Sequence, residues 1–96
     1  MNLIFKHYEL AFEGTAATRM TFSSYPGMIS SLDDFYVMEP TGLLMTQTTN
    51  GIYNQTLYDF VLPASLPAWV RVRVSNAIAE TCAMWATTVA QWNSGT

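Results

Sequence analysis

The sequence predicts an α+β fold, with an antiparallel sheet in the N-terminal half and helices in the C-terminal half. Four short runs rich in aromatic and β-branched residues, separated by turn motifs that contain Gly or Pro, indicate strands before residue 50. After Asn50-Gly51 the apolar residues recur every three or four positions, which is the period of one helical face. Strands followed by helices in one short chain predict a helical layer on one face of a sheet.

The first two strands are expected at residues 2–12 and 20–24. Residues 2–12 alternate in the manner of a strand with one mostly apolar face, and residues 13–15 form a turn-like sequence. The Tyr25-Pro26-Gly27 motif ends the second strand in a tight turn, because Pro restricts φ and Gly tolerates a positive φ. These two segments therefore predict neighbouring strands.

The next two strands are expected at residues 35–38 and 42–49. Both runs are rich in aromatic, aliphatic or β-branched residues, and residues 39–42 between them have the sequence EPTG. A turn of this composition between two such runs predicts a hairpin.

The C-terminal half is predicted to be helical from Ser65, a suitable N-cap, with Pro67 tolerated in the first turn. Residues 70–74 also alternate with period two, so a strand there is the alternative. We expect Cys82 to be a packed, inert core residue and the three tryptophans to serve packing. The apolar stripe consists of Leu66, Val70, Val74, Ile78, Cys82, Trp85, Val89 and Trp92.

The composition is poor in charge and excludes several classes of function. Only 11% of the 96 residues are charged and the net charge is −3, which argues against a nucleic-acid partner. The uncharged stretch at residues 40–58 is too polar for a transmembrane helix. A small free-standing protein normally covers its surface with Lys and Glu. We therefore expect residues 1–96 to be part of a larger domain, truncated at both ends.

Few residues could carry chemistry. His7 lies in a predicted strand, where we expect a structural or partly exposed position and not a catalytic one. The adjacent Asp33 and Asp34 are expected to form a turn or a cap and not a paired acid site. One His and one Cys82 are too few ligands for zinc, so no metal or cofactor is expected.

Two polar motifs follow the last predicted strand. The TQTTN sequence at residues 46–50 has hydroxyl and amide groups that could line a substrate pocket or donate to an oxyanion, although an ordinary strand end would have the same composition. Asn54-Gln55-Thr56 is an N-glycosylation sequon, which we expect on a surface loop.

Five motifs also occur in order along the chain: FSSYPG at residues 22–27, SLDDFY at 31–36, GL with TQTTN within 42–50, WVRVRVSN at 69–76 and WNSGT at 92–96. Together they resemble the phospholipase B-like family. The resemblance implies an N-terminal-nucleophile (Ntn) hydrolase with an αββα sandwich, made as a secreted or lysosomal glycoprotein precursor. Its substrate would be a lipid or an acyl amide. After self-cleavage, an N-terminal cysteine would attack the ester or amide carbonyl of this substrate.

The resemblance assigns few site residues to this chain. The nucleophilic cysteine and the motif after it would lie upstream, and neither Cys82 nor His7 matches them. Thr49 matches a residue that lines the active site in the family, and its neighbours Thr48 and Asn50 are assigned with it to substrate binding. Gln47 stands where relatives often have Glu. The arginines of the WVRVRVSN motif are expected in surface or interface pairs.

The expected function is accordingly that of one part of a hydrolase that cleaves acyl ester or amide bonds of lipids. Residues 1–96 alone should be inactive, and the remainder of the precursor would be their main partner. The alternative is a non-catalytic binding module that uses the apolar face of its sheet.

Overall fold

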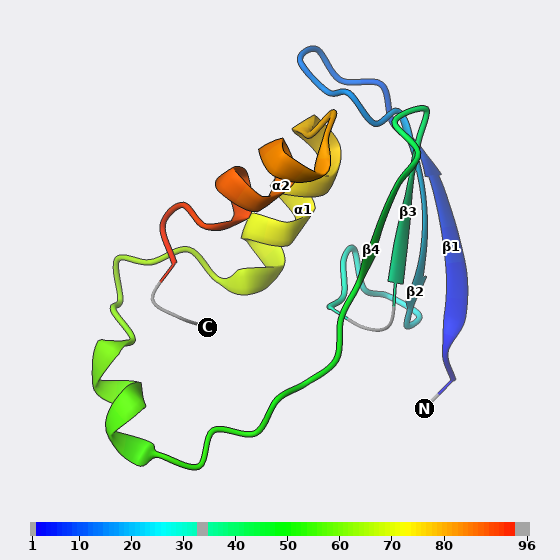
Figure 1. Ribbon diagram of the computed structural model, residues 1–96. Coiled ribbons are helices and arrows are strands. Elements are labelled where there is room, and N and C mark those ends of the chain that lie inside the picture. Colours follow the sequence, from blue (N-terminus) through cyan, green and yellow to red (C-terminus); the bar gives the residue numbers. More distant parts are fainter. Residues whose placement is uncertain (1, 33–34, 94–96) are drawn as a thin grey trace.

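The computed structural model describes residues 2–32 and 35–93 and confirms the α+β fold class (Figure 1). A four-stranded antiparallel sheet has the order β1-β2-β3-β4, and two helices lie together on one side of it. The elements are β1 (Ile4–Glu9), β2 (Arg19–Ser24), β3 (Phe35–Glu39), β4 (Leu43–Thr46), the 3₁₀ helix η1 (Gln55–Phe60), α1 (Ala68–Ile78) and α2 (Cys82–Val89).

Turn residues determine how the strands connect. Gly27 has φ of +80° and Met28 N–H donates to the Tyr25 carbonyl at 3.3 Å, as expected for the predicted tight turn. Gly42, with φ of +73°, lies in the predicted hairpin between β3 and β4. The prediction that β4 extends to residue 49 is wrong, because the strand ends at Thr46 and the residues after it leave the sheet.

The core lies between the sheet and α1. The rings of Phe22 and Tyr36 are stacked at 4.7 Å, and Tyr8 meets the Phe22 ring edge-on at 5.1 Å. Phe22 and Tyr36 are fully buried, and the Tyr36 hydroxyl donates to the Ser31 carbonyl and accepts from the Ser31 N–H. The buried core cluster consists of Ala17, Met20, Phe22, Tyr36 and Met38.

The C-terminal half is helical as predicted, and residues 70–74 are helix and not strand. The apolar stripe does not form one buried face, however, because the chain breaks into two helices between residues 78 and 82. The Thr81 hydroxyl caps α2 by accepting from the Met84 N–H at 3.2 Å, so a new helix begins there. The side chains that α1 buries are Arg71, Val72, Ser75 and Asn76.

The tryptophans divide between two environments. Trp69 is about half exposed and Trp92 is largely exposed, so among the described residues these two are not the packed side chains that were expected. Trp85 is half-buried and donates from Nε1 to Asn76 Oδ1 at 2.7 Å, which joins α2 to α1.

Arg71 bonds backbone carbonyls where the two helices meet, whereas the resemblance had implied a surface or interface pair. Its side chain is only 8% exposed, and its guanidinium donates to the Leu66 carbonyl at 3.0 Å and to the Val89 carbonyl at 2.7 Å. The Leu66 N–H donates to the Trp92 carbonyl at 2.7 Å and closes the same end of the helix pair. The bond to Val89 satisfies a carbonyl in the last turn of α2, where the helix leaves it without an intrahelical partner. Arg73, in contrast, lies over the Tyr8 ring at 5.9 Å.

Replacing Arg71 by methionine should therefore lower the free energy of unfolding by about 2–3 kcal/mol, because two partly buried carbonyls lose their donor. Urea unfolding followed by tryptophan fluorescence measures this change. Arg19→Met removes only an exposed ion pair with Glu39 and is the control, with an expected loss of about 0–1 kcal/mol. Equal losses for the two variants would contradict the role assigned to Arg71.

The connection between β4 and α1 runs away from the sheet and helices before it returns (Figure 1). It contains η1, which buries none of its residues. The Tyr53 side chain is 95% exposed and that of Phe60 is 67% exposed. This segment is thus rich in apolar surface that the described residues leave uncovered.

Candidate functional site

The polar segment that follows β4 is fully accessible. Thr48, Thr49 and Asn50 are all exposed and lie outside regular secondary structure. Within residues 2–32 and 35–93, no hydrogen bond engages the side chains of these three residues. Their hydroxyl and amide groups are therefore available to a ligand, and Thr49 can donate one hydrogen bond from its Oγ1.

A groove of about 250 Å³ lies directly before this segment. One of its walls is the strand β4, and the other is formed by Cys82 and Trp85, one turn apart on α2. The groove ends at Thr46, which is also the first residue of the TQTTN motif. It therefore combines an apolar lining with a polar segment at one end.

Cys82 is exposed, which corrects the expectation of a packed core cysteine. It is the first residue of α2, and the break after α1 turns it away from the core and into the groove. The groove was not foreseen from the sequence. The helical spacing of Cys82 and Trp85 was the available signal, but it did not show which element they face.

Asn76 holds the tryptophan wall of the groove in place. Its Oδ1 accepts from Trp85 Nε1 at 2.7 Å, and its side chain is completely buried. Its Nδ2 has no hydrogen-bond partner among the described residues. The bond fixes the indole orientation, since a buried polar pair tolerates little displacement.

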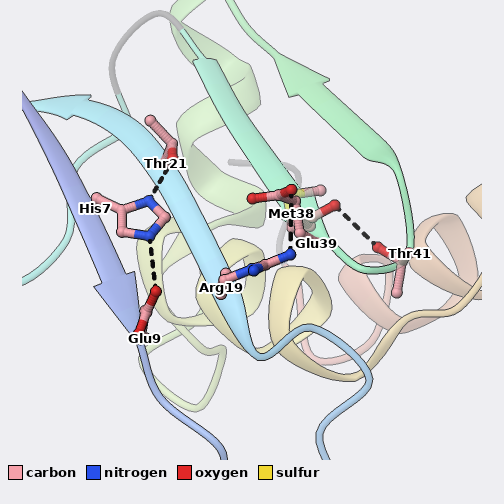
Figure 2. Close-up of polar contacts among 7 residues, drawn as sticks. All are labelled: His7, Glu9, Arg19, Thr21, Met38, Glu39 and Thr41. Carbon is pink, nitrogen blue, oxygen red and sulfur yellow. Dashed lines mark hydrogen bonds and ion pairs between the residues drawn. The ribbon is translucent and has the colours of Figure 1, made fainter.

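A second polar cluster lies on the sheet face opposite the helices (Figure 2). His7 Nδ1 is 2.8 Å from Thr21 Oγ1, directly across from it on β2, and His7 Nε2 is 3.5 Å from Glu9 Oε1. The fold thus brings together the Thr21 hydroxyl, the His7 imidazole and the Glu9 carboxylate. The His7 and Glu9 side chains are 49% and 72% exposed, so solvent screens the pair.

The remaining contacts of this cluster are structural. Arg19 Nη2 and Glu39 Oε1 lie 3.5 Å apart on directly opposed positions of β2 and β3 (Figure 2). The Thr41 hydroxyl donates to the Met38 carbonyl at 3.3 Å within the hairpin turn. The opposite charges of Arg19 and Glu39, directly across from each other on neighbouring strands, favour the observed register. His7 accordingly has the partly exposed position that was expected of it.

The sequon lies on the exposed connection between β4 and α1. Asn54 is the N-cap of η1, and its Oδ1 accepts from the Thr56 N–H at 3.2 Å and from the Thr56 hydroxyl at 2.8 Å. Both residues are exposed. Both bonds use the amide oxygen, and neither uses the amide nitrogen.

Three further expectations concern chemistry at other positions. Asp33 and Asp34 lie outside the described residues. Among the described residues, no three His, Cys, Asp or Glu side chains come close enough to bind a metal ion together. In the same part of the chain, no helix has the length and apolar character required to cross a membrane.

Comparison with known proteins links the whole chain to one family. The family model for phospholipase B matches residues 1–96. The chain is 47% identical over 95 residues to phospholipase B-like 1 of Rattus norvegicus and 46% identical over 95 residues to phospholipase B of Crotalus adamanteus. It is 41% identical over 97 residues to phospholipase B-like protein A of Dictyostelium discoideum. Each match covers 97% of this chain but only 17% of the relative, so the chain spans about a sixth of their length.

Proposed function

The chain belongs to the phospholipase B family, and from this premise we propose that it is one part of a lipid acyl hydrolase. The complete enzyme would cleave acyl ester or amide bonds of lipids with an N-terminal cysteine exposed by self-cleavage. That cysteine would be supplied by sequence upstream of residues 1–96, within an Ntn-type αββα sandwich. Residues 1–96 would contribute part of the catalytic sheet and would be inactive alone.

The observation that carries this proposal is the accessibility of Thr49, which follows the β4 groove along the chain. Its side chain is exposed and has no hydrogen-bond partner in the described part of the chain. We propose that its hydroxyl donates to the carbonyl oxygen that becomes negatively charged during attack. Thr48 and Asn50 would bind the polar part of the substrate beside it.

The proposal is tested with the complete polypeptide, purified from its source. Edman sequencing should give a processed chain that begins with cysteine upstream of Asn2. The processed protein should release fatty acid from phosphatidylcholine in mixed micelles or from an acyl amide, while the uncleaved precursor should not. A complete protein that neither cleaves itself nor hydrolyses either substrate would contradict the proposal and favour a binding role.

We further propose that the protein is a secreted or lysosomal glycoprotein that carries a glycan on Asn54. The proposal is supported by the exposure of Asn54 and by the bond from the Thr56 hydroxyl to its Oδ1. A glycan linked through Nδ2 would extend into solvent without displacing any described core residue.

Asn54→Gln should remove one glycan from the protein expressed in secretory cells. The expected result is a faster band on electrophoresis and the loss of the glycan from the mass spectrum of the peptide that contains residue 54. Asn50→Gln is the matched control, because Asn50-Gly51-Ile52 is not a sequon. An unmodified Asn54 in the parent protein would contradict the proposed glycosylation.

A further inference from the structure

Strand β4 is an edge of the sheet, and its outer side has no partner among the described residues. An edge strand presents unpaired N–H and C=O groups on alternate residues, and these groups require hydrogen-bond partners when they are buried. The only strand that pairs with β4 in residues 2–32 and 35–93 is β3. Half of the β4 backbone groups are therefore available for a further strand.

The groove described above runs along this edge. It is lined by four consecutive residues of β4, from Leu43 to Thr46. Because successive side chains of a strand point to opposite faces, a groove that touches all four must follow the strand edge and not one face of the sheet. Cys82 and Trp85 form its opposite wall. The shape is that of a slot for an extended chain.

Charge distinguishes this edge from the other one. Residues 40–58, which include β4, contain no charged residue. On the opposite edge, β1 contains Lys6, His7 and Glu9, and Lys6 lies across from Phe22 on the face that the helices cover. Its ammonium group donates to the Met28 carbonyl. An inward-pointing charge on an edge strand opposes pairing with another strand, and β4 contains no charged residue.

We propose that the slot between β4 and α2 binds a fifth strand, an uncharged extended segment of the same longer polypeptide that pairs with β4. Its backbone would satisfy the free β4 groups, and its apolar side chains would cover Cys82 and Trp85. The inference rests on the part of the proposed function that makes this chain one piece of a longer polypeptide, whether or not that polypeptide is a hydrolase. The relatives are long enough to contain such a strand, since the chain spans only 17% of their length.

The test is hydrogen exchange of the complete native polypeptide, read at single residues by fragmentation in the mass spectrometer. All amides of residues 43–46 should exchange at least about 100-fold more slowly than in the unfolded chain, because every one is then bonded. Some amides of β1 should exchange faster than those of β4. Cys82 should resist iodoacetamide in the native protein and react after unfolding in urea.

Three results would overturn the inference. Rapid exchange at alternate β4 amides with native labelling of Cys82 would mean that the slot is empty. Protection that disappears on dilution, together with a dimer in analytical ultracentrifugation, would mean that a second copy fills it. A protected β1 edge beside an open β4 edge would reverse the assignment of the edges.

Lipid hydrolysis measured on the same preparation separates this inference from the proposed function. An active enzyme with an open β4 edge would refute only the fifth strand. An inactive protein with a protected β4 edge would refute only the hydrolase.

Discussion

Truncation of Phe22 to alanine is expected to lower the free energy of unfolding by about 3–5 kcal/mol. Phe22 is fully buried in the middle of β2, with the Tyr8 ring at 5.1 Å and the Tyr36 ring at 4.7 Å. Its removal would leave a cavity between the sheet and α1 that the paired strands cannot close by moving. Denaturant unfolding of the complete protein measures the loss.

Phe22→Leu is the control, because leucine retains much of the buried apolar volume. We expect it to cost clearly less than the alanine variant, since the cost follows the size of the cavity. If the alanine variant were as stable as the leucine variant, Phe22 would not be a centre of the core.

Replacement of Thr49 by valine should lower kcat for lipid hydrolysis by about 100-fold in the complete enzyme. Valine preserves the β-branched shape but cannot donate a hydrogen bond, so a bond formed mainly in the transition state is lost. KM and the free energy of unfolding should change little, because the Thr49 side chain is exposed and has no partner in the described structure. Steady-state kinetics and thermal unfolding measure the three quantities.

Thr49→Ser tests whether the hydroxyl is the essential group. Serine keeps the donor, so this variant should retain most of the parent kcat, although it loses a methyl group. A valine variant with parent kcat would show that Thr49 is an ordinary residue of an exposed segment. A rise in KM at constant kcat would assign Thr49 to substrate binding alone.

These predictions assign different roles to the two ends of β4. Its first residues pack near the core, where Leu43 and Met45 are partly buried against the cluster of Phe22 and Tyr36. Its last residue opens into the exposed TQTTN segment. In the proposed enzyme, a stable sheet would thus position a segment whose polar groups remain available to substrate.

Much of the sheet could be predicted because its signals are local. The Tyr25-Pro26-Gly27 turn depends on the restricted φ of Pro and the positive φ that Gly permits, and both are properties of single residues. Aromatic and β-branched residues then determine which runs become strands, and the strand at Met20–Ser24 was expected within one residue of its observed start. The family motifs are equally local, because they are read directly from the order of residues.

The amino-acid sequence by itself determined the α+β class, the succession of antiparallel strands and then helices, and membership of the phospholipase B family. Only the tertiary structure decided that Arg71 is buried, that Cys82 is exposed and that β4 ends at Thr46. Helical periodicity shows which residues share a face, but the face that is buried depends on how two helices pack. Here the helix pair buries the Arg71 guanidinium, which bonds the Val89 carbonyl at the end of α2.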